Sequence, residues 1–331
     1  MLRHAHPAFQ TGPYVTIMRP QTSLLMCPPD FYGIEYEINP WMDLRRPADP
    51  ERARAQWRAL YETLTETLGV RVELLTPVKG LPDLVFTANA GLVVPSRLKL
   101  PAASCREASK CEEGEARSTS ARLPRDKLRG MRSQSTFVAS RFLHPERQKE
   151  QPTYEAWFRA RGYAIETLPE GTCFEGEGDA LWLGDALFAG YRIRSDIRSH
   201  QGLAAMLGCE VLSLDLVDPR FYHLDTCFCP LDNRRALYYP PAFDDYGRRV
   251  IHEFVPEPIA VGDVDALRFA CNAVVVGRDV VVQSGCDTVE KTLRAHGFTP
   301  RPVDLSEFHK AGGSAKCLGL WVPSCEDKEA G

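Results

Sequence analysis

Cys317 is the side chain best placed for nucleophilic catalysis. It lies in the segment 312–320, GGSAKCLGL, where the glycines allow a close backbone approach just before a last apolar strand. A thiol in such a position can act as a nucleophile. A buried structural role is nevertheless the commoner fate of any one of eleven cysteines. The case for catalysis therefore depends on the polar residues that can meet it.

His223 and Asp225 are the first of these residues. They stand in the segment 221–228, FYHLDTCF. If this segment is extended, both side chains point to the same face. A potential acid/base group and a carboxylate would then enter one cavity. The alternative is an ordinary surface histidine.

Acidic residues gather at two further places. Glu175 and Glu177 lie among glycines in the segment 172–181, TCFEGEGDAL, and Asp83 and Asn89 end the apolar stretch 83–89, DLVFTAN. A carboxylate buried beside apolar residues needs a partner, because burying the charge alone costs several kcal/mol. A cationic ligand would supply that partner. Each cluster taken singly is also compatible with an ordinary turn.

The elements that position these residues repeat along the chain. A helix that starts at Asp49 ends at Gly69 and leads into a strand at 70–75. Gly162 to Gly208 spans 46 residues and Gly208 to Gly297 spans 89, about two such units. Including a weaker passage at 246–261, this spacing predicts five units. The other helices are expected at 146–161, 196–207 and 287–296, each followed by a strand at 163–168, 209–214 and 298–303.

Short strands flank these helices and predict a closed ring. Strand ends in such a ring converge on a central axis, so polar residues there would surround one cavity for a small substrate. The expected flanking strands are 180–183, 186–191, 236–239, 273–276 and 280–283.

One stretch does not fit the repeat. Residues 97–135 are rich in Arg, Lys, Ser, Glu and Ala, contain no aromatic residue, and separate two predicted strands at 91–94 and 136–139. We expect a disordered insertion at the tip of a hairpin, within a single domain that spans 1–331. Its ten Lys and Arg against five Asp and Glu could suggest a binding arm, but a solvated loop is the preferred interpretation.

Composition favours a small-molecule partner. A formal charge of −4 and a pI near 6.1 indicate no basic face for nucleic acid. The N-terminus shows no apolar leader and no run reaches transmembrane length, so we expect reduced cysteines, a cytoplasmic location and no membrane partner. The cysteine spacings do not favour a metal, and we expect no cofactor. A homo-oligomer is compatible with the sequence.

The motifs taken in order resemble a known family. They are similar to those of the guanidino-modifying enzymes, which include arginine deiminases, dimethylarginine hydrolases, amidinotransferases and arginine dihydrolases. The resemblance covers the chain apart from the insertion and the extreme ends. It implies the pentein fold, a five-bladed α/β propeller of ββαβ units, in agreement with the repeats. The motifs are Asp83, Glu175/Glu177, His223-x-Asp225 and Gly312-Gly313-x-x-x-Cys317.

The resemblance also implies roles for individual residues. Cys317 would attack the guanidino carbon, His223 would act as acid and then as base, and Glu175, favoured over Glu177, would be the catalytic carboxylate. Segment 190–196, GYRIRSD, is similar to the family's Arg-Thr-Asn/Asp motif. Its Arg194 would clamp the substrate α-carboxylate. The substrate-binding residues implied are Asp83, Asn89, Asp225, Arg194, Asn39 and Arg141.

Asn89 departs from the deiminase pattern, which has a second acidic residue there. An amide offers both a donor and an acceptor, which suits a neutral ureido group better than a carboxylate does. The leading hypothesis is therefore hydrolysis of arginine twice, to ornithine, carbon dioxide and two ammonia. The alternatives are single hydrolysis of arginine or a methylated arginine, amidino transfer to an amine, and an arginine-binding propeller without turnover.

Overall fold

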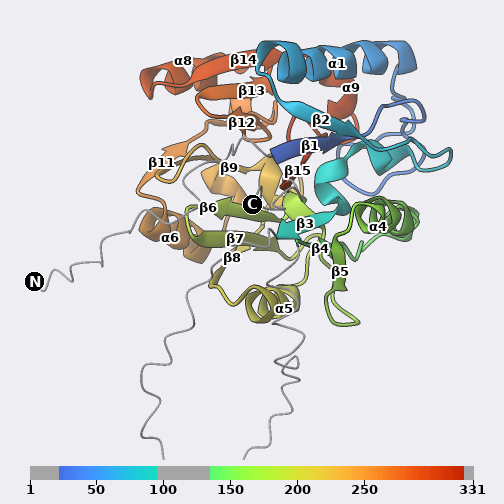
Figure 1. The fold of residues 1–331 in the computed structure, drawn as a ribbon. Helices are drawn as coiled ribbons and strands as arrows, with labels where there is room; N and C mark the ends of the chain where they lie inside the picture. Colours follow the sequence, from blue (N-terminus) through green and yellow to red (C-terminus); the bar gives the residue numbers. More distant parts are fainter. Residues whose placement is uncertain (1–21, 95–134, 324–331) are drawn as a thin grey trace, which may run out of the picture.

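In a computed structural model of the protein, the described residues are 22–94 and 135–323. Each repeat is a three-stranded sheet built in the same way (Figure 1). The inner strand pairs antiparallel with the middle strand, and the middle strand pairs parallel with the outer strand after a helical crossover. This is the predicted ββαβ unit, and it occurs five times among the described residues.

Four of the sheets follow the chain in order. They are β3 (Gly91–Val94), β4 (Thr136–Ala139) and β5 (Ala164–Thr167); β6 (Ala180–Leu183), β7 (Ala186–Tyr191) and β8 (Val211–Asp215); β9 (Phe228–Pro230), β10 (Arg235–Tyr238) and β11 (Glu257–Ala260); and β12 (Val274–Val276), β13 (Asp279–Gln283) and β14 (Thr299–Val303).

The fifth sheet closes the propeller. β1 (Thr22–Met26) pairs antiparallel with β15 (Leu320–Pro323) and parallel with β2 (Arg71–Leu74). Thr22 lies opposite Pro323 in this register, so the two ends of the described chain share one sheet. Because the last inner strand pairs with the first middle strand, the residues just before β15 are held against the start of the chain.

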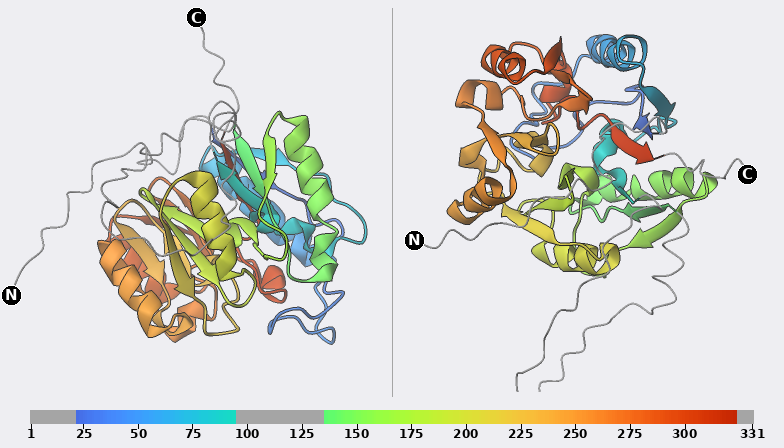
Figure 2. Two further views of the ribbon diagram at one scale, coloured as in Figure 1. Left: turned by 90° about the horizontal axis from the view of Figure 1, so that it is seen from below. Right: turned by 60° about the vertical axis from the view of Figure 1, so that its left-hand side comes forward.

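Helices lie around the outside of the sheets, as the views in Figure 2 show. Asp49 accepts hydrogen bonds from two N–H groups of the first helical turn, as expected for an N-cap, and Gly69, Gly162, Gly208 and Gly297 adopt positive φ where their helices end. The crossover helices are α1 (Pro50–Glu62), α3 (Pro145–Gln148), α4 (Gln151–Ala160), α5 (Ile197–Leu207), α6 (Asp245–Phe254) and α8 (Asp287–Ala295); α7 (Asp263–Ala266) and α9 (Ser306–His309) are short.

One predicted helix is wrong in its continuity. A single helix was expected at 146–161, but α3 and α4 are separate. Pro152 has no N–H with which to bond the Gln148 carbonyl, and this interrupts the helical ladder. The helix that begins with α1 continues toward Gly69, as expected, but over Thr63–Thr67 it is a π-helix, which the sequence did not predict.

The expected hairpin around the insertion is confirmed, with Val94 opposite Thr136. Most of the insertion lies outside the described residues. Among the described residues, no helix is both long and apolar enough to cross a membrane. The apolar core fills the space between sheets and helices, and its largest cluster joins the sheets of β6 to β13.

Candidate active site

The five inner strands each begin beside a polar side chain of one site. Asn89 stands two residues before β3, Asp179 directly before β6, Asp225 three before β9, Asn272 two before β12 and Cys317 three before β15. Pseudo-fivefold repetition therefore carries these residues to the same end of the axis. Three-residue 3-10 turns, η4 (Gly176–Gly178) and η5 (Leu224–Thr226), lead into β6 and β9.

A narrow cavity lies at this end of the axis. Its walls combine apolar side chains with a few charged and amide groups, the usual make-up of a small-molecule site. The lining residues are Ile38, Asn39, Met42, Asp83, Phe86, Asn89, Arg147, Arg194, Tyr222, Ala311, Gly313 and Cys317.

Cys317 is buried in this site and touches two polar groups. Its Sγ lies 3.4 Å from Asp225 Oδ2, and Asn272 Nδ2 donates to Sγ at 3.1 Å. Burial, followed by the negative charge of Asp225, raises the pKa of the Cys317 thiol well above its usual value. Burial also raises the pKa of Asp225 to about 7, against the opposing effect of Lys316. In the resting site Cys317 is therefore a protonated thiol that donates a hydrogen bond to Asp225.

His223 is held by Glu175. The His223 Nε2 lies 2.7 Å from Glu175 Oε2, and both side chains are buried. Burial lowers the pKa of His223 to about 4, despite the opposing effect of Glu175. Burial alone would raise the pKa of Glu175, but Arg194 and His223 outweigh it and lower that pKa. A charged Glu175 accepts the proton on Nε2, which leaves Nδ1 as the basic nitrogen.

Arg194 lies beside this pair. It donates to Glu175 Oε2 at 3.2 Å and to the Ile38 carbonyl at 2.9 Å, and its guanidinium lies 4.7 Å from the Tyr222 ring centroid. Arg194 is buried and lines the cavity, and it also holds the Glu175 carboxylate.

Arg147, which the sequence did not single out, links Asp83 and Asn89. It donates from Nη1 to Asn89 Oδ1 at 2.9 Å and from Nη2 to the Asp83 carbonyl at 3.2 Å. Glu150 binds the same guanidinium through two hydrogen bonds of 2.9 Å. Because Arg147 only donates, the Asn89 amide is oriented with its oxygen toward Arg147. Its Nδ2 lies 3.4 Å from the Glu175 carbonyl oxygen.

Two buried carboxylate oxygens in this site have no hydrogen-bond partner among the described residues. They are Asp83 Oδ1 and Asp225 Oδ1. Burial raises the pKa of Asp83 as well, although Arg147 opposes it. Unpaired buried acceptors are costly. The site is therefore complementary to a ligand that carries several N–H donors and a positive charge.

The geometry distinguishes the two acidic residues of the glycine-rich segment. Glu175 contacts His223, whereas Glu177 accepts a hydrogen bond of 3.0 Å from Lys316. Gly178 packs between Asn89 and His223. A larger residue would not fit there, because a Cβ would overlap the Asn89 amide nitrogen and lie 3.4 Å from the His223 ring.

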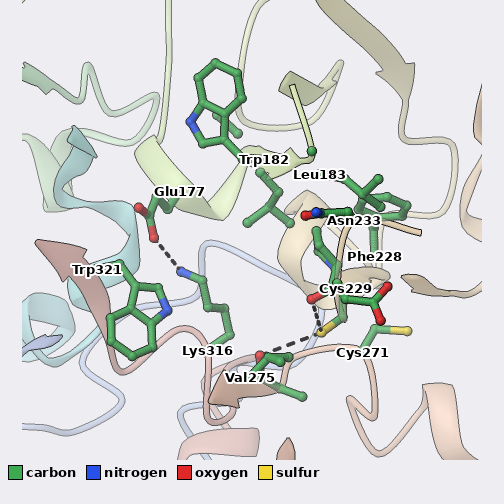
Figure 3. A pocket seen from close by; sticks show the side chains of 16 residues that line it. Glu177, Trp182, Leu183, Phe228, Cys229, Asn233, Cys271, Val275, Lys316 and Trp321 are labelled. Atoms are coloured by element: carbon green, nitrogen blue, oxygen red, sulfur yellow. Dashed lines mark hydrogen bonds and ion pairs between the residues drawn. The ribbon is translucent and has the colours of Figure 1, made fainter. Parts of the chain in front are cut away.

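A second cavity lies beyond the Lys316–Glu177 ion pair (Figure 3). Its walls are mostly apolar and include Trp182 and Trp321. Lys316 and Glu177 both line this cavity, whereas Cys317, the chain neighbour of Lys316, lines the first.

Two other predicted residues hold parts of the backbone. Asn39 lines the first cavity, but its amide donates to the Ala311 carbonyl and accepts from the Trp41 N–H. Arg141 is not among the cavity-lining residues of the described chain; its Nε donates to the Leu168 carbonyl at 3.0 Å. No substrate contact of either residue follows from this arrangement.

The expected extended segment around His223 is wrong in detail. His223 itself is extended, but Leu224–Thr226 form a 3-10 turn. Asp179 accepts the Leu224 N–H at 3.0 Å, and the Thr226 hydroxyl donates to the His223 carbonyl, which together fix this turn. His223 and Asp225 reach the site through the turn and not through strand alternation.

Asn272 also escaped the sequence interpretation, although a signal existed. It is a polar residue directly before the apolar run 273–276, AVVV, and it stands two residues before β12, as Asn89 stands two residues before β3. Arg147 had no such signal, because it lies on the short helix α3 and reaches the site only through the fold.

Known proteins of similar sequence cover nearly the whole chain. The bifunctional arginine dihydrolase/ornithine cyclodeaminase AgrE of Nostoc is 44% identical over 310 residues, which are 92% of this chain and 38% of that protein. The N(G),N(G)-dimethylarginine dimethylaminohydrolase of Mycobacterium tuberculosis is 38% identical over 330 residues, 97% of this chain and 95% of that enzyme. This match spans both chains. The chain belongs to the guanidino-modifying enzymes of the pentein superfamily.

A solved structure supports the pentein assignment. The N-terminal domain of ArgZ, a cyanobacterial arginine dihydrolase, has a TM-score of 0.77 and 42% identity, and the match covers 92% of this chain and 98% of that domain. That domain has been solved as a cysteine-to-serine mutant bound to substrate and as an asparagine-to-serine variant covalently bonded to a reaction intermediate. No known family model matches the chain. Membership rests on these relatives, and the chain spans less than half of the bifunctional AgrE.

Proposed function

We propose that this protein hydrolyses the guanidinium C–N bond of arginine through a covalent intermediate on Cys317, and that it does so twice. The observation that carries the proposal is the pair of unpartnered carboxylate oxygens on Asp83 and Asp225, buried in the site with the thiol. A guanidinium has a planar set of N–H donors for them, and its charge offsets the burial of the carboxylates.

The first hydrolysis begins at Cys317. Sγ gives its proton to Asp225 and attacks the guanidino carbon. The released proton is relayed through His223 Nδ1 to a terminal nitrogen, which leaves as ammonia as its C–N bond breaks. An amidino-thioester cation remains on sulfur. A water that gives a proton to His223 Nδ1 then attacks the same carbon, and the C–S bond breaks to release the ureido product and the thiolate.

Asn89 is the reason to propose a second round. With Oδ1 held by Arg147, the amide can present only its Nδ2 donor to the substrate. A donor suits the carbonyl oxygen of a ureido group and retains citrulline. Attack by Cys317 on the ureido carbon expels the second ammonia, and water then releases a carbamic acid that decomposes to ornithine and carbon dioxide.

Incubation with arginine tests this function directly. Two ammonia per ornithine, with citrulline only transient, is the expected result. One ammonia per citrulline would place the protein with the deiminases, and dimethylamine from dimethylarginine would favour single hydrolysis of methylated arginine. Ornithine formed only with an added amine would indicate amidino transfer. Binding of arginine without any product would leave the binding propeller as the explanation.

The pH dependence of turnover should follow Asp225. Its pKa of about 7 in the free protein means that the carboxylate is ionised above that pH and protonated below it. The ionised form accepts the thiol proton and binds the cation, so kcat/KM should rise with pH through about 7. Bound guanidinium stabilises the ionised form and lowers its pKa, so the rise in kcat should come at lower pH. If the pH profiles of kcat and kcat/KM coincide, or if activity falls as the pH rises through about 7, the assignment of this pKa to Asp225 is wrong.

Arg194→Lys tests the proposed carboxylate clamp. Lys cannot reproduce the bidentate fork, so kcat/KM for arginine should fall about 10- to 100-fold more than for agmatine, which lacks the carboxylate. Arg194 also binds Glu175, and the loss of that contact should slow both substrates equally. The ratio of the two losses in kcat/KM therefore reports the contact with the α-carboxylate. An equal loss for both would mean that Arg194 acts through Glu175 alone.

A further inference from the structure

The Asn272 side chain uses all of its hydrogen-bonding groups beside Cys317. Its Oδ1 accepts the backbone N–H of Ser314 and of Cys317, each at 3.1 Å. Its Nδ2 donates to the Asp225 carbonyl at 3.1 Å and to Cys317 Sγ at 3.1 Å. The residue is completely buried. One amide therefore connects the segment that carries the nucleophile, the nucleophile itself and the Asp225 backbone.

The partners fix which end of the amide faces the sulfur. The backbone N–H groups of Ser314 and Cys317 can only donate, and the Asp225 carbonyl can only accept, so a flipped amide would lose three bonds. The group at Sγ is consequently an N–H donor. The second polar contact of Sγ is with Asp225 Oδ2, which accepts the thiol proton.

We propose that Asn272 is a catalytic residue that stabilises the thiolate of Cys317 through its Nδ2–H. The inference rests on the proposed role of Cys317 as nucleophile. When Sγ gives its proton to Asp225, the sulfur gains a full negative charge and the existing N–H bond becomes charge-assisted. The same thiolate is the leaving group when the C–S bond breaks in each hydrolysis. One fixed donor thus assists both the attack and the release.

The two ends of the amide separate this role from a purely structural one. Oδ1 holds the backbone of the nucleophile segment, and Nδ2 holds the sulfur. Asn272→Asp keeps an acceptor for both backbone N–H groups but has no donor for Sγ. Asn272→Ser is too short for either contact and adds no charge. Asn233→Asp, at a half-buried residue lining the second cavity, is the matched control.

The test is alkylation of Cys317 by iodoacetamide in the substrate-free protein, followed against pH by peptide mass spectrometry. Loss of the donor should raise the pKa of the thiol, so the alkylation rate near about pH 9 should fall about 10- to 100-fold in both Asn272 variants. The kcat for arginine should fall by a similar factor with little change in KM. Asn233→Asp should match wild type in both measurements.

A purely structural role of Asn272 predicts the opposite change in the alkylation rate. If Asn272 only holds the backbone, Asn272→Ser loosens the segment, water reaches the thiol, its pKa falls toward the ordinary value, and alkylation becomes faster. Faster or unchanged alkylation in Asn272→Ser overturns the proposal. If Asn272→Asp does not fold, the result for Asn272→Ser is sufficient to test the proposal. Because no substrate is present, the alkylation result stands even if arginine proves not to be the substrate.

Discussion

Cys317→Ser is expected to abolish turnover of arginine and formation of a covalent adduct. A serine hydroxyl buried beside Asp225 is far harder to ionise than a thiol, and a guanidinium is a poor electrophile, so kcat should fall by about 10⁴-fold or more. The two side chains are nearly isosteric, so the fold and arginine binding should persist. Ammonia release, intact-protein mass and binding calorimetry measure the three quantities.

A buried cysteine outside the first cavity provides the control for this substitution. Cys229 lines the second cavity, and Cys229→Ser should keep the activity of the wild type. Substantial ammonia release by Cys317→Ser would remove Cys317 as the nucleophile. Loss of activity in both variants with loss of the circular dichroism signal would point to unfolding instead.

Asn89→Asp is expected to convert a double hydrolysis into a single one, with citrulline as the product. A carboxylate at this position keeps the acceptor that Arg147 binds but replaces the Nδ2 donor to the Glu175 carbonyl by an oxygen, so the first step should survive at a reduced rate. The donor to the ureido carbonyl is replaced by an acceptor, which loses one hydrogen bond and adds one repulsion. A cost of about 2 to 4 kcal/mol corresponds to a roughly 30- to 1000-fold slower second hydrolysis.

Citrulline supplied as substrate isolates the second step, and chromatography of ornithine and citrulline formed from arginine measures both. Asn233→Asp again serves as the control and should give the ornithine yield of the wild type. If the wild type already stops at citrulline, or if Asn89→Asp leaves the ornithine yield unchanged, double hydrolysis is wrong. The chain would then join the deiminases or the dimethylarginine hydrolases in activity.

Much of the architecture follows from local sequence. Asp49 caps a helix because its side chain accepts the N–H groups of the first turn, and Gly208 ends one because it adopts φ 66° without a Cβ penalty. Since these signals act over a few residues, their recurrence at a fixed spacing was enough to predict five ββαβ units. The order of reactive residues between them was enough to indicate the family, and that resemblance led to the prediction of Cys317 as nucleophile and His223 as its acid/base partner.

The side-chain partners of the charged residues could not be predicted from local sequence in this way. Glu175 and Glu177 have similar local surroundings, yet one meets His223, 48 residues away, and the other meets Lys316, 139 residues away. Such pairings depend on how the inner strands close around the axis, where burial makes each unpaired charge costly and selects its neighbour. For the same reason Arg147 emerged as part of the site only when the fold had brought distant segments together.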